Sequence, residues 1–170
     1  MLEKVEQLLN EKKIVILVGN SGTGKTFITY QLINTYSQEK VNLIFNVSNA
    51  NFKEYCADAR NVEFKMLEDL TNFSLNKYQL IDTQSYGFEG KGCPSIIEAL
   101  QALDKQLTHN KQEAVLYLDD CPLQLHQEVI DYLIENSFVR IKVVVTCIYA
   151  SDIKGIENFA QIKLDRNRYV

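Results

Sequence analysis

The segment GNSGTGKT at residues 19–26 constrains the fold of this chain more than any other feature. It matches the pattern G-x-x-x-x-G-K-[ST] in full, and this pattern is meaningful only between a buried strand and a helix. Both neighbours are predicted. The apolar run from Ile14 to Val18 is typical of a strand buried on both faces, and a helix is expected from Lys25 to about Tyr36. The chain therefore builds a strand, a glycine-rich loop and a helix in succession.

The residue types in this loop predict phosphate binding. Glycines allow successive backbone N–H groups to converge on phosphate oxygens, and the N-terminus of the following helix adds positive potential. Lys25 would reach the β- and γ-phosphates of a nucleoside triphosphate, and the Thr26 hydroxyl would bind Mg²⁺. The candidate binding residues are Gly19, Asn20, Ser21, Gly22, Thr23, Gly24, Lys25 and Thr26.

A second run, VLYLDD at residues 115–120, ends in paired aspartates. A carboxylate at the carboxyl end of a central parallel strand lies beside the ligand crevice. We therefore expect Asp119 to hold Mg²⁺, directly or through water, and Asp120 to orient or deprotonate an attacking water. The alternative is a helix cap or turn residue, and it has more weight for Asp120 than for Asp119.

Thr146 ends the apolar run VVVT, again at a carboxyl edge if the strand is parallel. A hydroxyl at this position would touch the γ-phosphate or the attacking water. A β-branched threonine also suits a strand for purely conformational reasons, so both interpretations stay open. The candidate catalytic residues are then Lys25, Asp120 and Thr146.

The rest of the chain alternates between the two kinds of element. This alternation predicts an α/β protein with a parallel sheet, and 170 residues correspond to one domain. The remaining helices are expected at residues 2–12, 51–59, 94–109 and 123–135, and the remaining strands at 41–47, 62–66, 78–82, 114–118, 141–146 and 159–164.

Composition excludes several classes of protein. The net charge of −4 provides no basic field, so any contact with nucleic acid would be local. No apolar run reaches about 18 residues, which predicts no membrane span. The first residues place carboxylates among the apolar side chains, unlike a secretory signal. The four cysteines lack C-x-x-C spacing and are expected to be reduced thiols, which favours a cytoplasmic location.

The order of strand, GNSGTGKT, helix, VLYLDD, VVVT and a last strand resembles the core of P-loop NTPases of the additional-strand class. This class includes AAA+ ATPases, DNA motors and signal-transduction ATPases, and the paired aspartates before VVVT look most like the last of these. The resemblance implies a three-layer sandwich with a mostly parallel five-stranded sheet ordered 5-1-4-3-2. It also implies ATP and Mg²⁺ as cofactors and hydrolysis of the β–γ bond. A motor of this class predicts a homo-oligomer, and the sequence leaves the oligomeric state open.

The sequence departs from the AAA+ pattern in two places. We expect no helical lid after the last strand and a single domain at residues 1–170. AAA+ rings carry an arginine finger before the last strand, whereas the only cation here between Cys147 and Ala160 is Lys154. If the last strand is parallel, Arg166 and Arg168 follow it on the nucleotide edge, with a frayed basic tail as the alternative.

Several uses of such a core remain open. One is an ATPase motor or loader, and another is a nucleotide-controlled interaction module with little turnover. A small-molecule kinase is the third.

The glycine cluster at residues 86–92 predicts a loop for a nucleic-acid or protein partner, although a surface loop without a role is the alternative. The N-K-x-D motif of GTPases is absent, because Gln112 and Glu113 follow Asn110 and Lys111.

Overall fold

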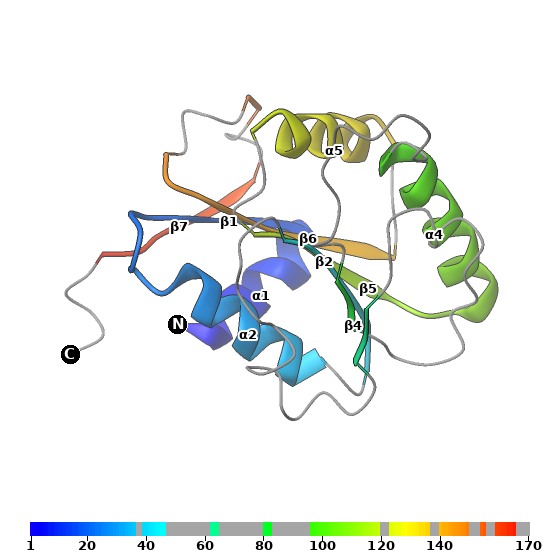
Figure 1. Cartoon of the computed structure of the whole chain (residues 1–170), viewed down its shortest axis with the longest axis horizontal. Helices are drawn as coiled ribbons and strands as arrows, with labels where there is room; N and C mark the ends of the chain where they lie inside the picture. Colours follow the sequence, from blue (N-terminus) through cyan, green and yellow to red (C-terminus); the bar gives the residue numbers. More distant parts are fainter. Residues whose placement is uncertain are drawn as a thin grey trace.

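A parallel β-sheet with helices on both faces forms the fold in this computed structural model (Figure 1). The structure describes residues 1–36, 39–46, 62–64, 80–82, 96–119, 123–136, 140–149, 154–155 and 159–165. In chain order its elements are α1 (Leu2–Lys12), β1 (Ile14–Val18), α2 (Lys25–Tyr36), β2 (Val41–Asn46), β3 (Val62–Phe64), β4 (Leu80–Asp82), α4 (Ile96–Asn110), β5 (Ala114–Asp119), α5 (Leu123–Glu135), β6 (Ile141–Cys147) and β7 (Ala160–Lys163).

The strand order is β3-β4-β2-β5-β6-β1-β7, and every neighbouring pair is parallel. If β1, β2, β5, β6 and β7 are numbered one to five, their order is 2-3-4-1-5, which confirms the expected arrangement. The sheet itself has seven strands, because the short strands β4 and β3 extend it beyond β2. β3 forms the edge of the sheet next to β4.

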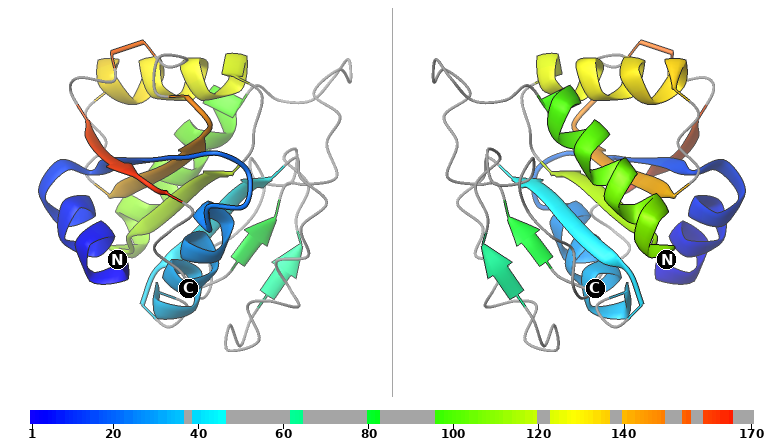
Figure 2. Two further views of the ribbon diagram at one scale, coloured as in Figure 1. Left: turned by 90° about the vertical axis from the view of Figure 1, so that its left-hand side faces the viewer. Right: turned by 90° about the vertical axis from the view of Figure 1, so that its right-hand side faces the viewer.

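Helices cover the two faces of the sheet in pairs (Figure 2). One apolar cluster joins α1 and α2 to the face of the sheet that carries Val15, Leu17 and Tyr117. The other cluster joins α4 and α5 to the opposite face, which carries Ile16, Leu116 and Val145. The three central strands β1, β5 and β6 are therefore covered on both sides, as expected for continuous apolar runs in a parallel sheet.

Parallel pairing brings the carboxyl ends of the central strands to one edge of the sheet. Gly19 follows β1 at this edge, and β5 and β6 end there at Asp119 and Cys147. Arg140 precedes β6 and so lies at the opposite, amino edge. Ligands in open α/β sheets bind at the carboxyl edge.

The predicted elements that fall on described residues are confirmed, and no end differs from its prediction by more than two residues. The helix predicted at residues 51–59 and the partner loop at 86–92 lie outside the described residues. So do Asp120, Arg166 and Arg168. Among the helices that the structure describes, none is long and apolar enough to cross a membrane.

Candidate functional site

The loop between β1 and α2 owes its shape to its glycines and to one threonine. Gly22 and Gly24 have φ angles of 78° and 87°, in the left-handed region that favours glycine. The Thr23 hydroxyl donates a hydrogen bond to the carbonyl oxygen of Asn20 at 2.8 Å, and the Thr23 side chain is buried. Together these features turn the chain sharply between the strand and the helix.

Gly19, the first residue of the loop, lies against two other parts of the chain. A Cβ atom added there would lie 2.5 Å from the Thr23 hydroxyl oxygen and 2.7 Å from the carbonyl oxygen of Leu164. The Gly19 N–H donates to the carbonyl oxygen of Cys147 at 3.1 Å, and the Leu164 N–H donates to that of Val18 at 2.8 Å. The start of the loop is thus held between the ends of β6 and β7.

The Lys25 side chain folds back over the loop. Its ammonium donates hydrogen bonds to the carbonyl oxygens of Gly19 at 2.6 Å and Asn20 at 3.1 Å. The residue is only 7% exposed, although it carries a charge. A buried cation is costly unless hydrogen bonds compensate it, and these two carbonyl groups provide that compensation. The loop therefore presents a positive charge at a fixed position.

A buried polar pair lies beside the loop at the carboxyl edge of the sheet. The Thr146 hydroxyl donates a hydrogen bond of 2.8 Å to Oδ1 of Asp119, and the two residues are 1% and 0% exposed. Thr146 also pairs in register with Leu17, two residues before Gly19. The backbone register places Asn46 of β2 next to Asp119 on its other side.

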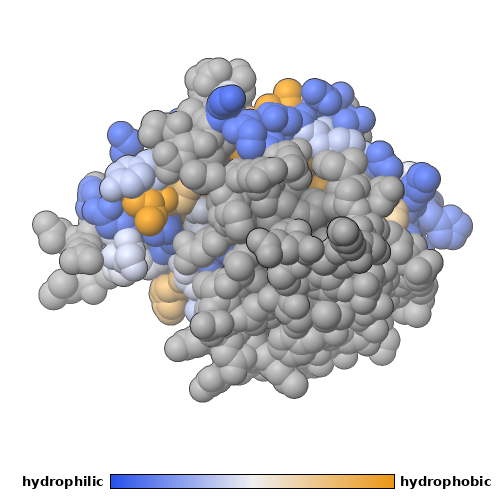
Figure 3. All heavy atoms as spheres, turned by 45° about the horizontal axis from the view of Figure 1, so that its top comes forward, coloured by the Kyte–Doolittle hydropathy of each residue, from blue (hydrophilic) through white to orange (hydrophobic). Residues whose placement is uncertain are grey.

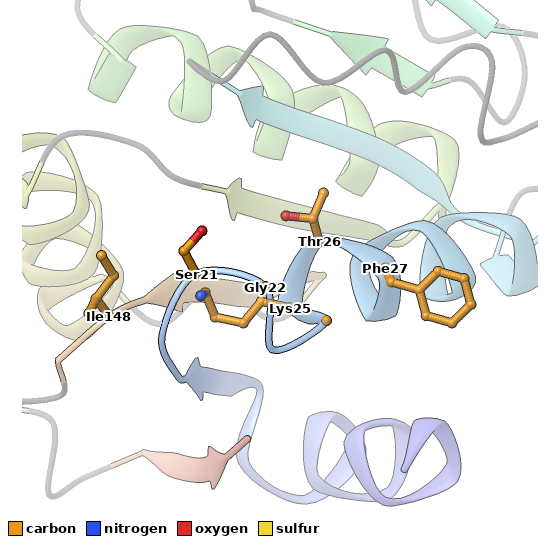
Figure 4. Close-up of a pocket in the computed structure, with 7 residues that line it drawn as sticks. Ser21, Gly22, Lys25, Thr26, Phe27 and Ile148 are labelled. Atoms are coloured by element: carbon orange, nitrogen blue, oxygen red, sulfur yellow. The ribbon is translucent and has the colours of Figure 1, made fainter. Parts of the chain in front are cut away.

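A pocket of about 510 Å³ opens over the loop (Figure 4). It is lined by Ser21, Gly22, Gly24, Lys25, Thr26, Phe27 and Ile148. In the close-up, Ile148 lies at one end, Ser21 and the Lys25 amine lie next to it, and Phe27 lies at the far end along α2. Six of the seven lining residues belong to the loop or the first turn of α2, and the seventh follows β6.

The residues present fit a nucleotide with Mg²⁺. The loop offers a fixed ammonium and a helix N-terminus to phosphate oxygens. The Thr26 hydroxyl and the Asp119 carboxylate are oxygen ligands of the kind that Mg²⁺ prefers. In the described part of the chain, no group of three or more His, Cys, Asp or Glu residues is arranged to hold a metal ion. Mg²⁺ that accompanies a nucleotide takes most of its ligands from phosphate and water and few from the protein.

Phe27 and Ile148 are site residues that the sequence analysis missed. Phe27 directly follows the phosphate-loop motif on α2, and an aromatic residue in a helix is usually expected to pack into the hydrophobic core. In the structure it is 55% exposed and lines the pocket. Ile148 follows β6 and is 46% exposed. The signal that could have found Phe27 is its adjacency to Thr26, which places it within reach of any ligand held there.

The sheet order and the loop geometry are those of a P-loop NTPase of the additional-strand class. The chain belongs to the Novel STAND NTPase 3 family, whose model matches residues 1–122. No curated protein matches the chain in sequence.

Two solved structures share the fold. Cdc6p from Pyrobaculum aerophilum is similar at 18% identity and a TM-score of 0.51, over 96% of this chain and 44% of that protein. The ORC2 protein of Aeropyrum pernix, solved as ADPNP–ADP complexes, is similar at 12% identity and a TM-score of 0.54, over 96% of this chain and 45% of that protein. The chain thus spans less than half the length of either protein.

Proposed function

We propose that this protein binds Mg-ATP at the loop 19–26 and hydrolyses it to ADP and phosphate. The observation that carries the proposal is the Lys25 ammonium, which two loop carbonyls hold within a pocket next to the Asp119–Thr146 pair. The nucleotide complexes of the Aeropyrum pernix protein, which has the same fold, add support. The core would serve a motor, a loader or a nucleotide-controlled switch.

Each residue of the site has a separate part in this proposal. Backbone N–H groups of the loop and the Lys25 ammonium would bind the β- and γ-phosphates. Thr26 and Asp119 would hold Mg²⁺, which supplies neutralisation of phosphate charge when bound. Asp120 would orient or deprotonate the attacking water. Thr146 donates a hydrogen bond to Asp119. It would keep that carboxylate in place and contact the γ-phosphate or the water.

Thermal unfolding with and without Mg-ATP tests the proposal. Ligand at about 100 times its Kd stabilises a fold by roughly 2.7 kcal/mol, which corresponds to a rise in Tm of about 5–10 °C for a chain of this size. Lys25→Ala should lose most of this rise relative to its own unliganded Tm. Lys105→Ala, a change of an exposed lysine on α4, should keep it. If the wild-type protein shows no shift with millimolar Mg-ATP or Mg-GTP, the nucleotide proposal is wrong.

Steady-state turnover separates the uses that the sequence leaves open. A motor or loader predicts turnover stimulated by DNA, RNA or a protein, and a change of mass on adding ATP if it assembles as a homo-oligomer. A switch predicts tight binding with very slow turnover. A kinase predicts ADP release that depends on an added small-molecule acceptor. Deletion of residues 86–92 should remove polymer stimulation if that loop binds the partner, while basal nucleotide binding persists.

A further inference from the structure

Phe27 is an exposed aromatic residue at a built pocket. The large hydrophobic residues exposed in the described part of the chain are Met1, Phe27, Ile134, Ile148 and Tyr149. Single exposed apolar side chains are normal on a protein surface, and among the residues that are coloured in Figure 3 the apolar spots are separate from one another and hydrophilic residues predominate. Phe27 and Ile148 differ from the other three because they line the same pocket.

The pocket has two different ends. The Lys25 amine and Ser21 lie towards Ile148, whereas Phe27 lies beyond Thr26 at the opposite end (Figure 4). A phosphate chain held by the loop and Lys25 would occupy the first end. The volume of the pocket, about 510 Å³, is in the range of small-molecule sites, which leaves space beyond the phosphates. The remainder of a nucleotide would then lie towards Phe27.

We propose that the Phe27 ring is the contact surface for the nucleobase. Phe27 is the one aromatic side chain among the described residues that line the pocket. The face of an aromatic ring stacks on any base, because every base has a π-face. Phe27 thus adds affinity for the base without distinguishing adenine from guanine. This inference rests on the proposed nucleotide binding and identifies the part of that site which holds the base.

Binding measurements on Phe27→Ala test the inference. Loss of base stacking should raise the Kd for Mg-ATP and for Mg-GTP by a similar factor of about 5–150. The Kd for Mg-tripolyphosphate, which has no base, should stay within twofold of the wild-type value. Ile134→Ala removes an equally exposed apolar side chain outside the pocket and should change none of these constants. Unchanged nucleotide affinity in Phe27→Ala would overturn the proposal, as would an equal loss of tripolyphosphate binding.

A spectroscopic test does not depend on that truncation. The chain contains no tryptophan, so Phe27→Trp introduces a single indole at the pocket. ATP should quench its fluorescence by stacking, and tripolyphosphate should not. In Ile134→Trp, ATP should leave the fluorescence unchanged. Absence of quenching in a Phe27→Trp protein that binds ATP would exclude stacking there. If wild-type protein binds neither ATP nor tripolyphosphate, the proposed function fails instead.

Discussion

The Thr146 hydroxyl has a stability role that can be measured without any ligand. It donates to Asp119 in a fully buried setting, and removing a donor from a buried carboxyl group costs about 1–3 kcal/mol. Thr146→Val keeps the shape of the side chain but not the donor, so we expect a loss of about this size in urea unfolding. Thr146→Ser keeps the hydroxyl and should recover most of it. Equal stability of Thr146→Val and wild type would mean that the hydrogen bond contributes nothing.

The paired aspartates should separate in a kinetic comparison. Asp119→Asn keeps an oxygen for the Thr146 hydroxyl but loses charge, so Mg²⁺ should increase ATP affinity less than in wild type. Asp120→Asn should bind ATP normally and turn it over about 100-fold or more slowly, because its proposed role belongs to the transition state. ATP titrations with and without Mg²⁺, together with kcat, provide the comparison. Equal loss of binding in both variants would show that the two roles are misassigned.

Individual site residues differ in how well the sequence predicts them. The glycines and Lys25 were predictable because the motif fixes their spacing between a strand and a helix. For Thr146 the sequence left two interpretations, because a β-branched residue suits any strand. Its hydrogen bond to Asp119 depends on the pairing of β5 with β6, which no local pattern encodes. Phe27 was missed because its exposure also depends on tertiary contacts, namely on what packs around α2.

The junction between α2, β2 and β5 carries a pH-dependent ion pair. Lys40 and Glu113 form a salt bridge, and the Lys40 hydrogen bond is the main reason that the pKa of the Glu113 carboxyl lies below its ordinary value of 4.5. Because the pKa is lowered, the ionised carboxylate stabilises the fold at pH values above its ordinary pKa. This contribution disappears as the pH falls through the lowered pKa of the folded protein. Because Glu113 is largely exposed, screening limits the gain to about 1 kcal/mol or less.

Glu113→Gln should therefore be slightly less stable than wild type at pH 7, by up to about 1 kcal/mol. The difference should shrink as the pH is lowered below the ordinary carboxyl value of 4.5, because the wild-type carboxyl then becomes protonated. Urea unfolding at several pH values measures it. Glu135→Gln changes an exposed glutamate at the end of α5 and serves as the control. A stability difference that grows at acidic pH would contradict the assignment.

The short strands mark the limit of prediction for the elements. The long apolar runs at residues 14–18 and 114–118 predict buried strands, and the structure has both of these strands. β3 and β4 have three residues each, too few for periodicity to fix their neighbours. Their addition beyond β2 enlarged the sheet relative to the five strands expected. The order of the core strands came from family resemblance, because hydrophobic pattern alone does not encode it.

Across the whole molecule, Gly19 is the point where the phosphate loop approaches the end of β7 closely. Gly19→Ala would place a methyl group 2.7 Å from the Leu164 carbonyl oxygen, so backbone must move. Overpacking of this kind costs about 1–3 kcal/mol, or roughly 2–12 °C in Tm for this chain length. Gly22→Ala meets no atom within 4 Å and differs only by its φ of 78°, so its loss should be smaller. If Gly22→Ala is the less stable variant, crowding at Leu164 is not limiting.

That contact also links two regions that would otherwise fluctuate separately. β7 is the edge of the described sheet next to β1, and edge strands are the parts of a sheet that open most easily. Fraying of β7 removes the Leu164 atoms that rest on Gly19, and it breaks the hydrogen bond from the Leu164 amide to Val18. We therefore expect the amides of Leu164 and the phosphate loop to exchange as one cooperative unit. A ligand that slows hydrogen exchange in the loop should then slow it at Leu164 and β7 as well, even where the ligand itself does not touch that strand.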